Sequence, residues 1–266
     1  MNYNQFEVES RFDGKLKIAY LNHPETYNAL NRMTLKELRE FMEECDDDPK
    51  VRCIAIGGKG KAFCSGQNLK SVTEMNFDSN DKVIRRIVME DYNPLVLSII
   101  KNKKPVISLV NGAAVGSGAM LALICDFTLA MESAYFSQAF GNIGLIPDTG
   151  GTYFLPKLLG RQMANYLTFT GKKISATEAK QLGLIAEVFA DDEFEAKSNE
   201  ILEFMSNHAT MAIGLTKRAF LYSYSNTLQD QLEMEGTFQQ KAAFSKDFHE
   251  GITAFMEKRK PKYKGK

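Results

Sequence analysis

Residues 104–127 read KPVISLVNGAAVGSGAMLALICDF, and this stretch decides the fold because a buried strand in it leads directly into a glycine-rich loop. The apolar run 103–112 predicts a strand with Pro105 at its entrance, where a missing backbone donor is tolerated. The spacing Gly-x-x-x-Gly-x-Gly over residues 112–118 matches neither a dinucleotide-binding fingerprint nor a P-loop. Because open α/β sheets place ligands at strand ends, this loop is either a tight turn or part of a ligand site.

The segments before this stretch alternate between strand and helix patterns. Residues 15–22 and 51–58 predict strands, and residues 28–45 predict a helix opened by a capping box of Thr34 and Glu37. The apolar face expected for this helix consists of Leu35, Leu38, Met42 and Cys45. An amphipathic segment follows over residues 82–102. Repeated strand and helix indicate an α/β fold with a parallel sheet and crossovers.

The segments after it continue this alternation to about residue 191 and then change. Ser175 and Glu178 form a second predicted capping box, Gly183 ends that helix, and residues 184–189 predict a strand. Beyond residues 191–197 only long helical stretches follow. We therefore expect a core over residues 1–195 and a helical region over residues 196–266.

The composition excludes several classes of protein. The chain has 266 residues, of which 44% are apolar and 25% charged, enough to bury a sizeable core. Lys plus Arg and Asp plus Glu number 33 each, so no net field favours nucleic acid or a membrane surface. We expect neither export nor membrane insertion, because no apolar run approaches the ~20 residues that span a bilayer. The four cysteines and three histidines show no zinc or disulfide pattern, which fits a reducing cytoplasm.

Six stretches, taken in order, resemble the crotonase (enoyl-CoA hydratase/isomerase) superfamily. They are HPETYNALN, AFCSGQNLK, KPVISLVNGAAVGSGAMLALICDF, IGLIPDTGGTYFLPKLLG, SATEAKQLGLIAEVF and FMEKRKPKY, spread with matching spacing over residues 15–263. The resemblance implies a spiral of ββα repeats, with the acyl-CoA site in residues 1–195 and a helical trimerisation region in residues 196–266. It also implies a homotrimer or hexamer that binds an acyl-CoA thioester and needs no cofactor, because coenzyme A is part of the substrate.

The resemblance further implies an oxyanion hole for the thioester carbonyl. By motif position its donors are the backbone N–H groups of Gln67 and Ser117, whose dipoles are fixed before charge develops on the oxygen. Ser117 stands where many relatives have glycine, which leaves the amide available. The other residues expected to contact the substrate are Ser65, Gly66, Asn68, Leu69, Gly116, Met120, Phe140, Leu145 and, through the CoA phosphates, Lys258. The segment 71–92 has no readable motif and is expected to shape the acyl pocket.

The positions of the catalytic acids separate the reactions of the superfamily. Hydratases use two glutamates where this chain has Met120 and Phe140, and neither side chain can transfer a proton. Asp148 instead matches the single aspartate of the ring-1,2-epoxyphenylacetyl-CoA isomerase group, whose IGLIPD-x-GGT stretch this chain repeats almost letter for letter. 4-Chlorobenzoyl-CoA dehalogenases also carry an aspartate there, but they rely on a tryptophan, and this chain has none. The favoured hypothesis is isomerisation by Asp148, with apolar walls that include Leu145 and Ile146 raising its pKa.

Readings that do not depend on the family stay open at three places. Asp148 in the sequence PDTG can equally cap backbone N–H groups of a turn. Asp126 is expected to satisfy local donors rather than to catalyse. Tyr135, Ser137 and Gln138 either line the acyl pocket or only pack in the core. For the whole chain, the alternatives are an enoyl-CoA hydratase with unusual acids and a non-catalytic acyl-CoA binder.

Overall fold

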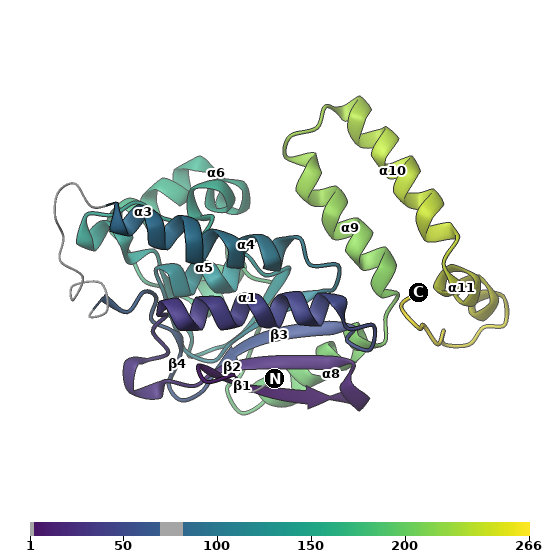
Figure 1. The fold of residues 1–266 in the computed structure, drawn as a ribbon, viewed down its shortest axis with the longest axis horizontal. Helices are drawn as coiled ribbons and strands as arrows, with labels where there is room; N and C mark the ends of the chain where they lie inside the picture. The colour runs from purple at the N-terminus through teal and green to yellow at the C-terminus, as the bar shows by residue number, and fades with distance from the viewer. Residues whose placement is uncertain (1–2, 70–81) are drawn as a thin grey trace.

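The computed structural model describes residues 3–69 and 82–266, which form two β-sheets with helices around them (Figure 1). The larger sheet contains, in spatial order, β1 (Phe6–Arg11), β2 (Leu16–Leu21), β3 (Cys53–Gly58), β5 (Val106–Val110), β7 (Phe127–Met131) and β10 (Glu187–Phe189). The smaller sheet contains β4 (Ala62–Cys64), β6 (Ala113–Val115), β8 (Tyr135–Ser137) and β9 (Ile174–Ser175).

From β3 to β8, successive strands alternate between the two sheets. β3, β5 and β7 each enter the larger sheet, and the strands that follow them, β4, β6 and β8, enter the smaller one. Neighbours in each of these series pair in parallel, which requires a crossover between them. The crossovers carry α3 (Val83–Ile87), the π-helical turn η3 (Val88–Tyr92), α4 (Asn93–Ile100) and α5 (Ser117–Leu123). Helix α6 (Gly151–Thr170) follows β8 and leads to β9, which pairs with β8 in antiparallel orientation. This order is the repeated ββα unit that the resemblance implies.

Helix α1 (Arg32–Asp47) buries the predicted face, but its predicted capping box is wrong. Asn31 is the N-cap, because its extended backbone leaves the side chain free to accept from the N–H of Thr34, 2.9 Å away. Glu37 instead accepts from the backbone N–H groups of Asn4 and Gln5, each 2.9 Å away. The N-cap therefore lies three residues before the predicted one, and the Glu37 carboxylate binds the backbone near the N-terminus. All four residues predicted for the apolar face are buried: Leu35, Leu38, Met42 and Cys45.

The second predicted cap, at α7 (Ala176–Gln181), is confirmed in one of its two halves. Ser175 accepts from the N–H of Glu178 at 3.1 Å, whereas the carboxylate of Glu178 pairs with Lys172. Gly183 follows the helix with φ +73°, as expected of a residue that ends it. The strand after it, β10, begins only at Glu187, because the N–H of Leu184 still donates to Ala179.

Alternate residues of the larger sheet enter two apolar layers. On β3, Ile54 packs in the cluster that includes α1, whereas Cys53 packs in the cluster that includes Phe194 and Leu202 of α8 (Phe194–Ser206). Because successive strand side chains point to opposite faces, α1 and α8 cover opposite sides of this sheet. Helix α8 is thus packed on the core, although it lies within the predicted C-terminal helical region.

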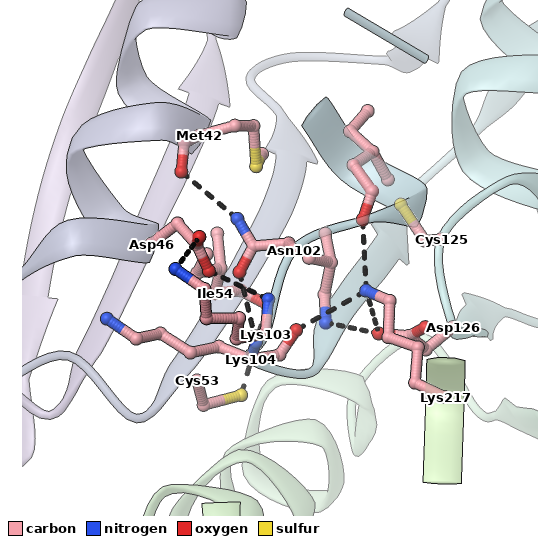
Figure 2. Close-up of polar contacts among 12 residues, drawn as sticks. Met42, Asp46, Cys53, Ile54, Asn102, Lys103, Lys104, Cys125, Asp126 and Lys217 are labelled. Atoms are coloured by element: carbon pink, nitrogen blue, oxygen red, sulfur yellow. Dashed lines mark hydrogen bonds and ion pairs between the residues drawn. The ribbon is translucent and has the colours of Figure 1, made fainter. Parts of the chain in front are cut away.

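Three further helices extend away from the sheets: α9 (Thr210–Ser223), α10 (Leu228–Ala243) and α11 (Lys246–Met256) (Figure 1). We call residues 210–256 the arm. Lys217 of α9 fastens the arm to the core, since its ammonium donates to the carbonyl of Ile99 at 2.9 Å and to Asp126 Oδ2 at 2.8 Å (Figure 2). Asp126 also accepts from the N–H of Val106 at 2.7 Å. The prediction that Asp126 satisfies local donors is confirmed.

A membrane-spanning helix is not found in the described part of the chain, where each helix is too short or too polar for that role.

Candidate active site

A cavity of about 260 Å³ lies where three neighbouring strands of the smaller sheet end. Because β4, β6 and β8 run parallel, their carboxyl ends meet at one edge. The loops that leave these ends line the cavity together with the α3–η3 segment. The lining residues among those described are Ser65, Gly66, Gln67, Leu69, Ile84, Ile87, Val88, Tyr92, Val115, Gly116, Ser117, Ala139, Phe140, Asn142, Ile143, Leu145 and Asp148.

Two glycines allow the loops after β4 and β6 to close against each other. Gly66 has φ +90°, and Gly116 has φ +55° with ψ −125°, conformations that residues with a Cβ rarely adopt. A Cβ on Gly66 would lie 2.7 Å from the carbonyl oxygen of Val115 and 3.5 Å from the amide nitrogen of Ser117. The two backbones therefore approach as closely as glycine permits.

The N–H groups of Gln67 and Ser117 come directly after these glycines. Ser117 is the first residue of α5, where helical N–H groups have no partner within the helix. Gln67 lies opposite Leu30 in a parallel bridge whose hydrogen bonds use the carbonyl of Gly66 and the N–H of Asn68. Among the hydrogen bonds of residues 3–69 and 82–266, neither N–H group is a donor. Within the described residues, both N–H groups are therefore free to bind a ligand oxygen.

Asp148 enters the cavity from the turn that precedes α6. Its carbonyl accepts from the N–H of Gly151 at 2.7 Å and so closes the turn, while its carboxylate accepts from the Thr149 hydroxyl at 2.8 Å. The turn thus uses the main-chain carbonyl of Asp148, and the residue is one of those that line the cavity. Burial raises the pKa of this carboxyl above the ordinary aspartate value, and the bond from Thr149 opposes that shift only in part.

Most of the residues predicted to contact substrate lie in the cavity wall. Ser65, Gly66, Gln67, Leu69, Gly116, Ser117, Phe140, Leu145 and Asp148 are all among the lining residues. Met120 is not, because it is fully buried in α5 and packs under the start of α6, against Gly151. Asn68 lies just behind the wall, with its N–H bonded to Leu30. Ile146, an expected wall, is 77% exposed and also lies outside the lining.

Lys258 lies far from the cavity of its own chain. It follows α11, and Figure 1 shows α11 and the cavity-lining α3 at opposite ends of the molecule. Residues 71–81 of the segment expected to shape the acyl pocket lie outside the described residues, whereas residues 82–92 supply a wall of the cavity.

The residues of β8 and the turn after it pack rather than line the cavity. The Ser137 hydroxyl donates to the carbonyl of Gly171 at 2.9 Å, and Gln138 is 4% exposed. Tyr135 pairs with Ser175 across the smaller sheet. None of the three belongs to the cavity lining among the described residues, so the packing alternative holds for them.

Tyr92 lines the cavity and is 2% exposed. It is the last residue of the segment expected to shape the acyl pocket, but it was not predicted individually. Its hydroxyl donates to Gln67 Oε1 at 2.7 Å and lies 3.2 Å from Ser117 Oγ. The sequence carries one signal near Tyr92: Pro94 lacks the backbone N–H that a continuous α-helix would use. In the structure the residues before it form the π-helical turn η3, and such turns are frequent at functional sites. Ile84, Ile87 and Val88 also line the cavity and lie in the segment expected to shape the pocket, although they were not predicted individually. Asn142 was missed, and nothing in its sequence pattern separates it from an ordinary loop residue.

Comparison with known proteins identifies relatives over almost the whole chain. The sequence family described as enoyl-CoA hydratase/isomerase matches residues 14–266. A 1,2-epoxyphenylacetyl-CoA isomerase of Escherichia coli (strain K12) is 38% identical over 248 residues, 92% of this chain and 94% of that protein. A probable enoyl-CoA hydratase of Rhodobacter capsulatus is also 38% identical, over 266 residues and 100% of both chains.

A solved structure agrees with these sequence matches. An enoyl-CoA hydratase from Bacillus anthracis has a TM-score of 0.92 to this chain at 33% identity, covering 99% of this chain and 100% of that one. The crotonase-like α/β fold predicted from the motifs is therefore confirmed. The names of the relatives divide between isomerase and hydratase, so similarity alone does not select the reaction.

Proposed function

This chain belongs to the enoyl-CoA hydratase/isomerase family, which acts on acyl-CoA, and we propose that it is an isomerase that moves a double bond from position 3 to position 2 of an enoyl-CoA. Asp148 is the proton shuttle in this proposal. The backbone N–H groups of Gln67 and Ser117 bind the thioester oxygen.

The proposed reaction conserves all atoms and needs one acid–base group. The Asp148 carboxylate removes a proton from C2, and the electron pair moves onto the thioester oxygen, which gives a dienolate. The two N–H groups stabilise the negative charge because their dipoles are already oriented toward it. The same carboxyl then returns the proton to C4, and the double bond comes to lie between C2 and C3.

One observation carries this assignment: Asp148 is the only carboxyl group among the described residues that line the cavity. Its raised pKa makes it a stronger base than an exposed aspartate once it is ionised. Phe140 and Leu145, also in the wall, keep water away from an intermediate that water would protonate.

The related isomerisation of an aryl epoxide to an oxepin uses the same parts and is a second substrate class for this site. The relative from Escherichia coli that is named 1,2-epoxyphenylacetyl-CoA isomerase supports it at 38% identity. Under this assignment the chain would serve phenylacetate catabolism, and under the first, fatty acid metabolism.

Hydration is the alternative that the name of the Rhodobacter relative favours. The residues oppose it, because the positions of the two hydratase glutamates hold Met120 and Phe140, which exchange no proton. Crotonyl-CoA separates the two reactions, since only hydration removes the conjugated absorbance. A non-catalytic acyl-CoA binder would bind the thioester without turnover of any substrate.

The decisive experiment replaces Asp148 with Asn and measures turnover of a series of 3-enoyl-CoA chain lengths and of epoxyphenylacetyl-CoA. We expect kcat to fall about 1,000-fold, within the range for loss of a general base, while KM changes little because the cavity wall is kept. Asp192→Asn, on an exposed turn, is the control and should keep wild-type activity. Turnover retained in Asp148→Asn would refute the proposal.

The raised pKa of Asp148 gives two pH-dependent expectations with opposite consequences. Activity needs the carboxylate, so kcat/KM should rise with pH along a limb whose pKa lies above the usual aspartate value of about 3.9. Stability behaves inversely: folding favours the protonated form, so the folded protein loses stability as the pH rises through that window. Asp148→Asn should therefore unfold at a higher temperature than the wild type at pH 7 and at a similar temperature below about pH 3.9.

The proposal also assigns the arm a role: it joins the subunits of a trimer or of a pair of trimers. Large apolar side chains on it are exposed, including Phe244 at 78% and Phe255 at 82%. Assembly would also bring Lys258 of one subunit toward the cavity of another, where its ammonium can bind CoA phosphates. Residues 1–195 would then form the catalytic core and residues 196–266 the region that joins subunits.

A further inference from the structure

The two N–H groups of the proposed oxyanion hole come from separate loops. The N–H of Gln67 belongs to the peptide unit that follows Gly66, and the N–H of Ser117 to the one that follows Gly116. The carbonyl of Gly66 accepts from the N–H of Leu30 at 2.7 Å, and the carbonyl of Gly116 accepts from the N–H of Met120 at 3.0 Å, so each unit is held within its own part of the chain. Oxyanion stabilisation depends on donors that do not reorganise relative to each other during the reaction. These two backbone bonds do not connect the donors, so their mutual position depends on contacts between Gln67 and Ser117.

Tyr92 makes hydrogen-bond contacts with both donor residues through one oxygen. Its hydroxyl donates to Gln67 Oε1 at 2.7 Å, and a phenol has only one proton to donate. The contact of 3.2 Å with Ser117 Oγ is then made by the serine hydroxyl as donor. A single chain of hydrogen bonds thus runs from Ser117 through Tyr92 to Gln67.

Tyr92 is itself held rigidly. It is 2% exposed and ends the π-helical turn η3, which is followed by Pro94 of α4. The preceding residue, Asp91, binds Arg32 of α1 through a pair of 2.6 Å between Oδ2 and Nε. Burial and the nearby Asp148 charge raise the pKa of the phenol, so it stays protonated and remains a donor.

We propose that Tyr92 is a positioning residue that braces the oxyanion hole by fixing Gln67 and Ser117 relative to each other. The proposal rests on the proposed function only in using the same two N–H groups, and it does not require Asp148 to be the base. Tyr92 acts through the two donor residues and transfers no proton in the reaction.

The primary test is the infrared difference spectrum of bound butyryl-CoA labelled with ¹³C at the thioester carbonyl. A working hole lowers the stretching frequency of this carbonyl relative to that in water. In Tyr92→Phe, which keeps the ring, we expect the band to shift part of the way back toward its solution frequency. A band unchanged from the wild type overturns the proposal, and so does a wild-type protein that shows no lowering.

Tyr3→Phe is the matched control for the loss of one phenol hydrogen bond. The Tyr3 hydroxyl donates to Glu44 at 2.7 Å, the same length as the bond from Tyr92, and Tyr3 is not among the cavity-lining residues. Both variants should lower Tm, but only Tyr92→Phe should move the carbonyl band. A purely structural Tyr92 would give two variants that differ from the wild type in Tm alone, which overturns the proposal.

Kinetics on the enoyl-CoA that the wild type turns over add a second readout. Tyr92→Phe and Gln67→Met should each lower kcat about ten-fold with KM within about two-fold, because one hydrogen bond of about 1.4 kcal/mol is lost in the transition state. The double variant should lose about as much as Tyr92→Phe alone, because Tyr92→Phe already removes the bond to Gln67 together with the contact with Ser117. A hundred-fold loss in the double variant overturns the proposal. If Asp148→Asn keeps its activity while Tyr92→Phe moves the band, the choice of base fails and the brace stands.

Discussion

The core around α5 and the arm use their apolar residues in opposite ways. Every residue of α5 from Ser117 to Leu123 is buried, and the helix lies between the two glycine loops and the start of α6. In the arm, α9 buries only Thr210 and α10 buries none of its residues. Helix α10 still carries large apolar side chains, of which Leu228 is 76% and Leu232 57% exposed.

This difference separates the part of the molecule that holds the cavity from the part that exposes apolar surface. Among the described residues, those that line the cavity all belong to the core and none to the arm. A set of exposed apolar side chains of this extent is typical of a surface that another protein covers. We therefore expect changes in the core to alter chemistry and changes in the arm to alter assembly.

The largest effect is expected from Gly116→Ala in the core. The alanine Cβ would force the backbone out of φ +55° and misdirect the N–H of Ser117. Loss of one oxyanion donor lowers kcat about 100-fold to 1,000-fold, which steady-state kinetics will measure.

Gly183→Ala separates this effect from backbone strain alone. Gly183 has a similar positive φ of +73° and no neighbouring atom within 4 Å of the added Cβ. It should lose about 1 kcal/mol of stability and keep wild-type kcat. Equal losses of kcat in the two variants would contradict the assignment of Ser117 as a donor.

The double variant Phe244→Glu/Phe255→Glu in the arm is expected to change the oligomeric state. Burying an unpaired carboxylate in an interface costs about 2 kcal/mol or more per site, so the oligomer should dissociate. Sedimentation or light scattering measures the mass. Val8→Glu on β1, 41% exposed in the core, is the control and should keep the wild-type mass. An unchanged mass in the arm variant would show that the arm does not join subunits.

The smallest effect is expected where core and arm meet, in Lys217→Met. The side chain of Lys217 is 10% exposed and that of its partner Asp126 is 24% exposed, so the variant leaves a partly buried carboxylate without this ion pair. We expect the free energy of unfolding to fall by about 1–2 kcal/mol, less than for a fully buried pair. Lys180→Met breaks the exposed pair with Glu187 and should cost at most about 1 kcal/mol in the same denaturation experiment. Equal losses would mean that Lys217 does not fasten the arm.

The strands and the two glycine loops were predictable because their signals are local. A strand such as β5 is an apolar run with Pro105 at its start, and the loop after β6 carries glycines at fixed spacing. The cap of α1 was mispredicted by three residues because Asn31 and Thr34 are both good N-cap residues, and only the backbone conformation selects between them. The start of β10 was likewise predicted three residues too early, because the N–H of Leu184 still donates to the carbonyl of Ala179 at the end of α7.

Periodicity along the sequence was enough to indicate an α/β fold, and the resemblance of its six motifs was enough to indicate the family, the spiral and Asp148 as the candidate base. The tertiary structure decided that Met120 lies under the cavity wall rather than in it, and that α8 packs on the core. It also decided that Tyr92 connects Gln67 and Ser117. These features join residues distant in sequence, and side-chain contacts of that kind depend on how the helices pack on the sheets, which no local pattern encodes.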